Sequence, residues 1–180
     1  MNLCVVGCGS VGAALLHLVG MKSVEFDVPY KRIIFVDPDI ITDYNENHYS
    51  YPKVFAIEDQ LLNIGCKLEL IAINLTFDKY YLQLNETDID RTVFIDCRDS
   101  NEHSSRFYMK IYSDGPYGHI IKNPDNSSHK MYSNYKIKNS KYYALLTVSH
   151  IVDDIMNIKE KNIKSCSKQT EFVINHLCSK

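Results

Sequence analysis

Short, unbroken apolar runs alternate with helically spaced apolar residues over the first half of this 180-residue chain. The runs at 3–6, 32–37 and 92–97 predict buried parallel strands. Apolar positions three and four residues apart predict helices over 13–20 and 54–63. Strands that alternate with helices in this way predict an α/β protein with a Rossmann-like, mostly parallel sheet and helices on both faces.

The pattern after residue 97 is less regular, and the elements that it predicts are shorter. A strand at 118–121 follows a Gly-Pro turn, and 142–158 has the pattern of an amphipathic helix. The remaining expectations are an ordered loop over 39–51, a helix running into a strand over 67–74, a helix over 100–111, a flexible loop or hairpin over 122–141, and a last helix over 169–177 within a C-terminal extension, 159–180. We expect a single nucleotide-binding domain over 1–180.

A glycine-rich turn joins the first predicted strand to the first predicted helix. Gly7, Gly9 and Gly12 follow the G-x-G-x-x-G pattern. In this pattern the first glycine allows the tight turn, the second lets the backbone approach a phosphate, and the third allows close packing of helix on strand. The second strand ends at Asp37, where a carboxylate accepts hydrogen bonds from ribose hydroxyls. This βαβ context predicts a nucleotide site and fits either NAD or ATP.

Composition narrows the class of protein. A net charge of −2 gives no electrostatic case for a nucleic-acid partner or an anionic membrane. No apolar run approaches the roughly 20 residues that span a bilayer, and the start lacks the basic region of a secretion signal, so we expect a cytoplasmic protein. The 6 cysteines form no C-x-x-C pair, which favours reduced thiols. The wealth of Asn, Lys, Ile and Tyr suggests an AT-rich coding source such as a phage or virus genome.

Three further segments occur in an order that resembles the ThiF/MoeB-type, ubiquitin-activating-enzyme-like adenylating family. That family has an acid-x-acid pair, an aliphatic residue and an Asn, then a Gly-x-Lys or Gly-x-x-Lys element before a helix, then Asp-Cys-x-Asp-Asn with a later Arg. The matching positions are Asp37, Asp39, Ile41 and Asn45 in the first segment, Gly65 and Lys67 in the second, and Asp96, Cys97, Asp99 and Arg106 in the third. The resemblance covers residues 3 to about 110.

The resemblance implies a reaction and a set of roles. The family binds ATP·Mg²⁺ and adenylates the C-terminal carboxylate of a ubiquitin-like or sulfur-carrier protein, usually as a homodimer. By position, Asp37 would hold the ribose, Lys67 would neutralise phosphate charge, and Asp99 would hold Mg²⁺. Asp39 and Asn45 would belong to the same nucleotide site. His48 stands where the family has a phosphate-binding Arg, and its charge near pH 7 depends on its surroundings.

Two other functions remain open from the sequence. His48, the absent C-x-x-C zinc site and the lack of a placed catalytic thiol favour a degraded relative that binds a nucleotide or a partner without chemistry. Cys166 and Cys178 are the thiols considered for that role, and a surface or tail position without function explains them more simply. The glycine turn alone also permits an NAD-binding Rossmann domain.

Overall fold

The computed structural model describes residues 1–42, 50–100, 104–114, 117–124, 140–158 and 170–175. Asn45, His48, Cys166 and Cys178, with most of the expected 122–141 hairpin, lie outside these residues. The strands are β1 (Asn2–Val6), β2 (Arg32–Val36), β3 (Ile40–Thr42), β4 (Ser50–Pro52), β5 (Glu69–Ile73), β6 (Thr92–Asp96), β7 (Met109–Asp114), β8 (Tyr117–Lys122) and β9 (Thr170–Asn175). The helices are α1 (Ser10–Glu25), α2 (Lys53–Asn63), α3 (Phe77–Tyr81), α4 (Glu86–Asp90), α5 (Ser140–Ser149) and α6 (Val152–Met156).

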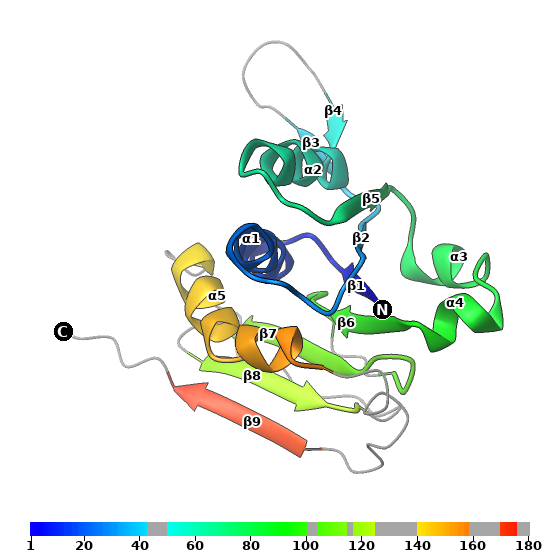
Figure 1. Cartoon of the computed structure of the whole chain (residues 1–180). Helices are drawn as coiled ribbons and strands as arrows, with labels where there is room; N and C mark the ends of the chain where they lie inside the picture. Colours follow the sequence, from blue (N-terminus) through cyan, green and yellow to red (C-terminus); the bar gives the residue numbers. More distant parts are fainter. Residues whose placement is uncertain (43–49, 101–103, 115–116, 125–139, 159–169, 176–180) are drawn as a thin grey trace.

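A seven-stranded sheet in the order β5-β2-β1-β6-β7-β8-β9 forms the centre of the protein (Figure 1). The strands from β5 to β7 run parallel, and β8 and β9 are antiparallel to their neighbours. The expected Rossmann-like α/β class is therefore confirmed. β3 and β4 pair separately as a small antiparallel sheet inside the segment that we expected to be a loop.

Alternate residues of the central strands pack against helices on opposite faces of the sheet. On β1, Leu3 and Val5 belong to the larger core with α1, α2, α5 and α6, whereas Cys4 and Val6 belong to a smaller core with α3. Figure 1 shows α1 and α5 side by side over one face, where they contact each other. Burial on both faces is why these strands are continuous apolar runs in the sequence.

Three helical expectations were wrong. Within 100–111, the residues from Met109 onward form β7, which pairs with β6 and β8. The segment expected as a last helix, 169–177, contains β9, which pairs with β8 along its whole length. Residues 67–74 contain the strand β5 but no helix. In each case hydrogen bonding to a strand distant in sequence overrides the local helical pattern.

The other expectations agree more closely with the structure. The helix over 54–63 is α2, and the strand at 118–121 is β8. The amphipathic segment 142–158 forms two helices, α5 and α6, with a turn at His150 and Ile151 between them. Within the described part of the chain, no helix is both long and apolar enough to cross a membrane.

The turn between β1 and α1 depends on two glycines that touch each other. Gly7 has φ +92°, a conformation that side chains disfavour, and a Cβ there would lie 2.9 Å from the Arg98 backbone nitrogen. A Cβ on Gly12 would lie 1.8 Å from the Gly7 carbonyl oxygen. Helix α1 therefore starts in direct contact with the end of β1, as the glycine pattern predicts.

Replacing Gly12 by alanine should destabilise the fold far more than the same change at Gly9. We expect Gly12→Ala to lower the free energy of unfolding by about 3 kcal/mol, because the new methyl group must displace backbone. At Gly9 a Cβ would meet nothing within 4 Å. Gly9→Ala should therefore cost about 1 kcal/mol or less, as a change of helix N-cap. Urea unfolding of the two variants measures the difference, and equal losses would contradict this account of the turn.

Candidate functional site

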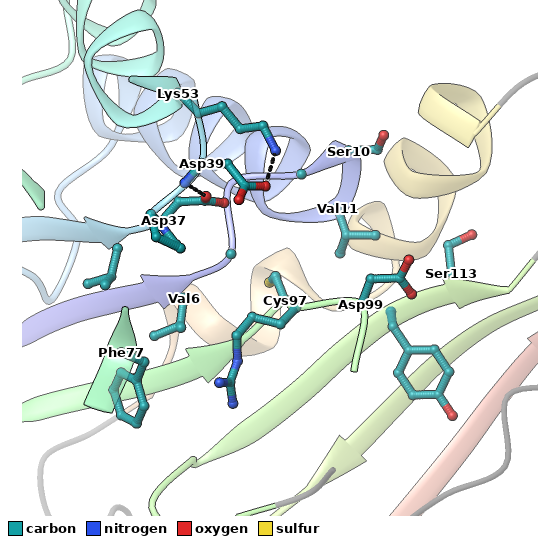
Figure 2. A pocket seen from close by; sticks show the side chains of 16 residues that line it. Val6, Ser10, Val11, Asp37, Asp39, Lys53, Phe77, Cys97, Asp99 and Ser113 are labelled. Atoms are coloured by element: carbon teal, nitrogen blue, oxygen red, sulfur yellow. Dashed lines mark hydrogen bonds and ion pairs between the residues drawn. The ribbon is translucent and has the colours of Figure 1, made fainter. Parts of the chain in front are cut away.

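A pocket of about 690 Å³ lies at the carboxyl ends of β1, β2 and β6, beside the first residues of α1. In open α/β sheets this is the edge at which ligands bind. Figure 2 shows the Lys53 side chain beside Asp39, across the pocket from Asp99 and Ser113. The lining residues include Gly7, Gly9, Ser10, Val11, Asp37, Asp39, Lys53, Phe77, Cys97, Arg98, Asp99 and Tyr112.

The glycine turn presents open backbone to this pocket. Gly9 is exposed and forms the N-cap of α1, with no side-chain cap in place. The free amides at a helix start, together with the helix dipole, attract a phosphate group. The space around Gly9 therefore suits the close approach of a phosphate.

Asp37 ties the glycine turn to the end of β2. Asp37 is only 5% exposed. One carboxylate oxygen accepts the Cys8 backbone N–H at 2.5 Å, and the other accepts that of Asp39 at 2.8 Å. Because each carboxylate oxygen has a second lone pair, Asp37 can still accept a hydroxyl from a bound ligand.

Lys53 is a basic residue of the pocket that the sequence analysis missed. It is the first residue of α2, and its Nζ lies 2.6 Å from an Asp39 carboxylate oxygen. This hydrogen bond raises the pKa of the Lys53 amine, so the side chain stays charged through neutral pH. The available signal was its place after Pro52 at the start of a helical pattern, since the resemblance asks for a lysine before a helix.

Lys67, which we had expected beside the phosphates, does not line this pocket. Its Nζ donates a 2.6 Å hydrogen bond to the carbonyl oxygen of Val24, near the C-terminal end of α1. Its backbone N–H donates to the Ser23 hydroxyl. The pocket lies at the other end of this 16-residue helix, about 20 Å away at 1.5 Å per residue. Lys67 precedes β5 and so lies at the opposite edge of the sheet.

Asp99 is an exposed carboxylate on the pocket wall, two residues beyond Cys97 at the end of β6. Among the residues that the structure describes, none forms an ion pair or hydrogen bond with its side chain. Mg²⁺ is commonly held by one or two carboxylates together with substrate phosphates. A carboxylate that lines the same pocket as Gly9 fits that pattern. No cluster of three or more metal-ligating side chains occurs within the described residues.

Arg98 adds a second cation to the pocket. Its guanidinium pairs side-on with Asp96, with Nε 2.9 Å from Oδ1 and Nη2 3.1 Å from Oδ2. It also lies over the rings of Phe77 and Phe107, with 5.7 and 5.2 Å from guanidinium carbon to ring centroid. These contacts hold the planar group in one orientation beside the pocket.

Several solved structures have a similar overall fold. No protein-family model and no curated protein matches the sequence. A crystal structure of E. coli MccB with MccA superposes with a TM-score of 0.62 at 12% identity, over 99% of this chain and 65% of that one. E. coli TcdA, a tRNA N6-threonylcarbamoyladenosine dehydratase in complex with ATP, gives 0.54 at 13% identity, over 86% of this chain and 85% of that one. PaaA gives 0.58 at 11% identity, over 97% of this chain and 60% of that one.

The fold is that of the ThiF/MoeB-type adenylating enzymes. MccB, PaaA and TcdA are all adenylating enzymes of this family, so the expected resemblance is confirmed at the level of the fold. The chain spans less than two thirds of the length of MccB. The TcdA structure, which it matches over most of both chains, is a complex with ATP.

The reactivity of two cysteines, Cys8 in the glycine turn and Cys66 outside it, tests how the turn is packed. Burial, and next the Asp37 carboxylate, raise the pKa of Cys8 from 9.0 to about 12, whereas Cys66 is only half-buried. Since the thiolate is the reactive form, iodoacetamide at pH 8 should modify Cys66 and spare Cys8 in the folded protein. Cys8 ionises in the unfolded chain near pH 9 but not in the folded one, so its contribution to stability should be lost as the pH rises from 9 to 12.

Peptide mapping after alkylation, with and without denaturant, separates the two thiols. In denaturant both should react alike. Equal modification of Cys8 and Cys66 in the folded protein would contradict the arrangement of Asp37 and the glycine turn.

Proposed function

We propose that this protein binds ATP·Mg²⁺ in the pocket beside the glycine turn and adenylates a carboxylate. The observation that carries the proposal is the convergence of Gly9, Lys53 and Asp99 on one pocket at the carboxyl edge of the sheet. A helix N-terminus, an ammonium group and a free carboxylate are what a triphosphate with its divalent cation requires. The fold shared with adenylating enzymes supports this reaction over NAD chemistry.

In the proposed reaction a substrate carboxylate oxygen attacks the α-phosphorus of ATP. The bond to the β-phosphate oxygen breaks, and the products are an acyl-adenylate and pyrophosphate. Asp37 and Asp39 would accept ribose hydroxyls, and the α1 amides would contact phosphate. Lys53, in place of Lys67, would move from Asp39 to neutralise phosphate charge. Mg²⁺, held by Asp99, would draw charge from the phosphate oxygens.

The substrate that we propose is the C-terminal carboxylate of a ubiquitin-like or sulfur-carrier protein. MccB has been solved together with MccA, which supports a polypeptide substrate. Net charge −2 gives no support to a nucleic-acid substrate of the kind named for TcdA. A homodimer is the expected assembly, because the family to which the chain is similar usually forms one.

Neutralising Lys53 should weaken ATP·Mg²⁺ binding, and neutralising Lys67 should not. We expect Lys53→Met to raise the Kd about tenfold or more, the effect of losing one contact to a charged group. Lys67→Met is the matched control, since its Nζ binds the Val24 carbonyl. Since the pKa of Lys53 is raised from 10.5, its effect on binding should be constant around neutral pH and be lost only in strong alkali.

Calorimetric titration with ATP·Mg²⁺, and separately with NAD, measures this difference. Weakening by the Lys67 change alone would return the phosphate role to Lys67. Binding of NAD without binding of ATP·Mg²⁺ would overturn the adenylation proposal and favour the NAD-binding alternative.

Adenylation itself is tested by exchange of labelled pyrophosphate into ATP. We expect exchange only when a sulfur-carrier protein with a free C-terminal carboxylate is present, and none when that C-terminus is amidated. Asp99→Asn removes the negative charge at nearly constant shape and should reduce exchange at least about a hundredfold. If the protein binds ATP·Mg²⁺ but no tested carrier protein or peptide acid supports pyrophosphate exchange, the result would support the degraded relative that only binds nucleotide.

A further inference from the structure

Lys110 is a lysine buried in the middle of the sheet, next to the pocket but not in contact with it. It lies on β7 between Met109 and Ile111, which pack into the larger core. Only 1% of its side chain is exposed. Lysine is almost never buried to this extent without partners, so the groups around its Nζ indicate what it does.

The Lys110 ammonium group has one acceptor for each of its three protons. Its Nζ lies 3.2 Å from Asp96 Oδ2, 3.4 Å from the Arg98 carbonyl oxygen and 3.3 Å from the Ser100 hydroxyl. The last two acceptors flank Asp99 directly in sequence. Lys110 therefore holds the backbone before Asp99 and the side chain after it.

The charge balance argues for a positioning role over a contribution to stability. Asp96 is as buried as Lys110, and it already pairs side-on with Arg98. A second, fully desolvated cation on the same carboxylate is costly, and an apolar side chain on β7 would fill the space at lower cost. What an apolar side chain could not do is bind both ends of the turn at 98–100.

Side-chain contacts hold Arg98 and Ser100 on either side of Asp99, whereas the Asp99 side chain has no partner among the described residues. The Arg98 backbone N–H also donates to Asp96, and between Asp99 and the start of β7 at Met109 the described residues form no helix or strand. The direction in which Asp99 points thus depends on the groups on either side of it.

We propose that Lys110 is a positioning residue. Its contacts with the Arg98 carbonyl and the Ser100 hydroxyl fix the turn at 98–100, so that the Asp99 carboxylate faces the phosphate end of the pocket. The proposal rests on the proposed function, because it assigns Asp99 to the divalent cation of ATP·Mg²⁺. In this role Lys110 touches neither nucleotide nor metal, and it acts on Asp99 only through the turn.

The test compares Lys110→Met with Lys122→Met. Methionine keeps the length of the lysine stem and removes the charge. Lys122 is the control, since it lies on the adjacent strand β8 and pairs with Asp154 at the surface. We expect Lys110→Met to raise the Kd for ATP about tenfold in Mg²⁺ and to leave it nearly unchanged in EDTA, because only the metal-dependent part of binding uses Asp99. Lys122→Met should change neither.

A second readout needs no nucleotide. Amide hydrogen exchange of a peptide covering 97–100 should become faster in Lys110→Met, while a peptide covering β1 keeps its rate. Unchanged exchange at 97–100, or equal loss of ATP affinity with and without Mg²⁺, would overturn the proposal. If the wild-type protein binds no ATP·Mg²⁺, the proposed function fails, and hydrogen exchange alone decides whether Lys110 holds the turn.

Ser100→Ala keeps the test open if Lys110→Met does not fold. It removes one of the three acceptors and leaves the buried ion pair with Asp96 intact. We expect a smaller loss in the same direction, confined to binding in Mg²⁺, with faster exchange at 97–100. A Ser100→Ala protein that matches wild type in both measurements would overturn the proposal.

Discussion

Contact between the glycine turn and the ends of the two neighbouring strands positions everything else in the pocket. Gly12 packs on the Gly7 carbonyl, and the Asp37 carboxylate binds the backbone N–H of Cys8 within the turn and that of Asp39 beyond β2. A glycine at position 7 also leaves room for Arg98, which follows β6. Three adjacent parallel strands therefore end against one turn, and their carboxyl ends share one cavity.

The charged side chains around this cavity form two groups, one partly exposed and able to change partners, the other mostly buried and held in place. Lys53 and Asp39 form a partly exposed pair at the rim, so either side chain can exchange its partner for a ligand at modest cost. Asp96, Arg98 and Lys110 form a mostly buried group under the turn that carries Asp99. Separating those charges would leave one of them desolvated and unpaired, and this cost keeps the turn in one arrangement.

Local pattern predicted β1, β2, β6, α1 and α2 because the residues of each of these elements follow a clear strand or helix pattern. β1, β2 and β6 are buried on both faces, so they are continuous apolar runs, and α2 has its apolar face at helical spacing. The prediction was wrong at β7 and β9, which were expected to be helical, at the helix expected within 67–74, and at β3 and β4, which were expected to be a loop. In β7 the apolar residues Met109 and Ile111 alternate with Lys110 and Tyr112. All four are buried, but the lysine and the tyrosine give the segment a polar appearance in the sequence. β9 depends on pairing with β8, about fifty residues earlier in the chain, which no local pattern reports.

By itself, the sequence determined the fold class, the glycine turn and the family resemblance, since these depend on residues close together in the chain. It also placed Asp37, Asp39 and Asp99 at strand ends, where parallel pairing brings them to one edge. Only the tertiary structure shows that Lys53 lines the pocket and Lys67 does not, because Lys53 begins α2 at the carboxyl edge of the sheet and Lys67 follows the other end of that helix. It alone joined Lys110 to the turn beside Asp99, because that contact requires β6 and β7 to lie side by side.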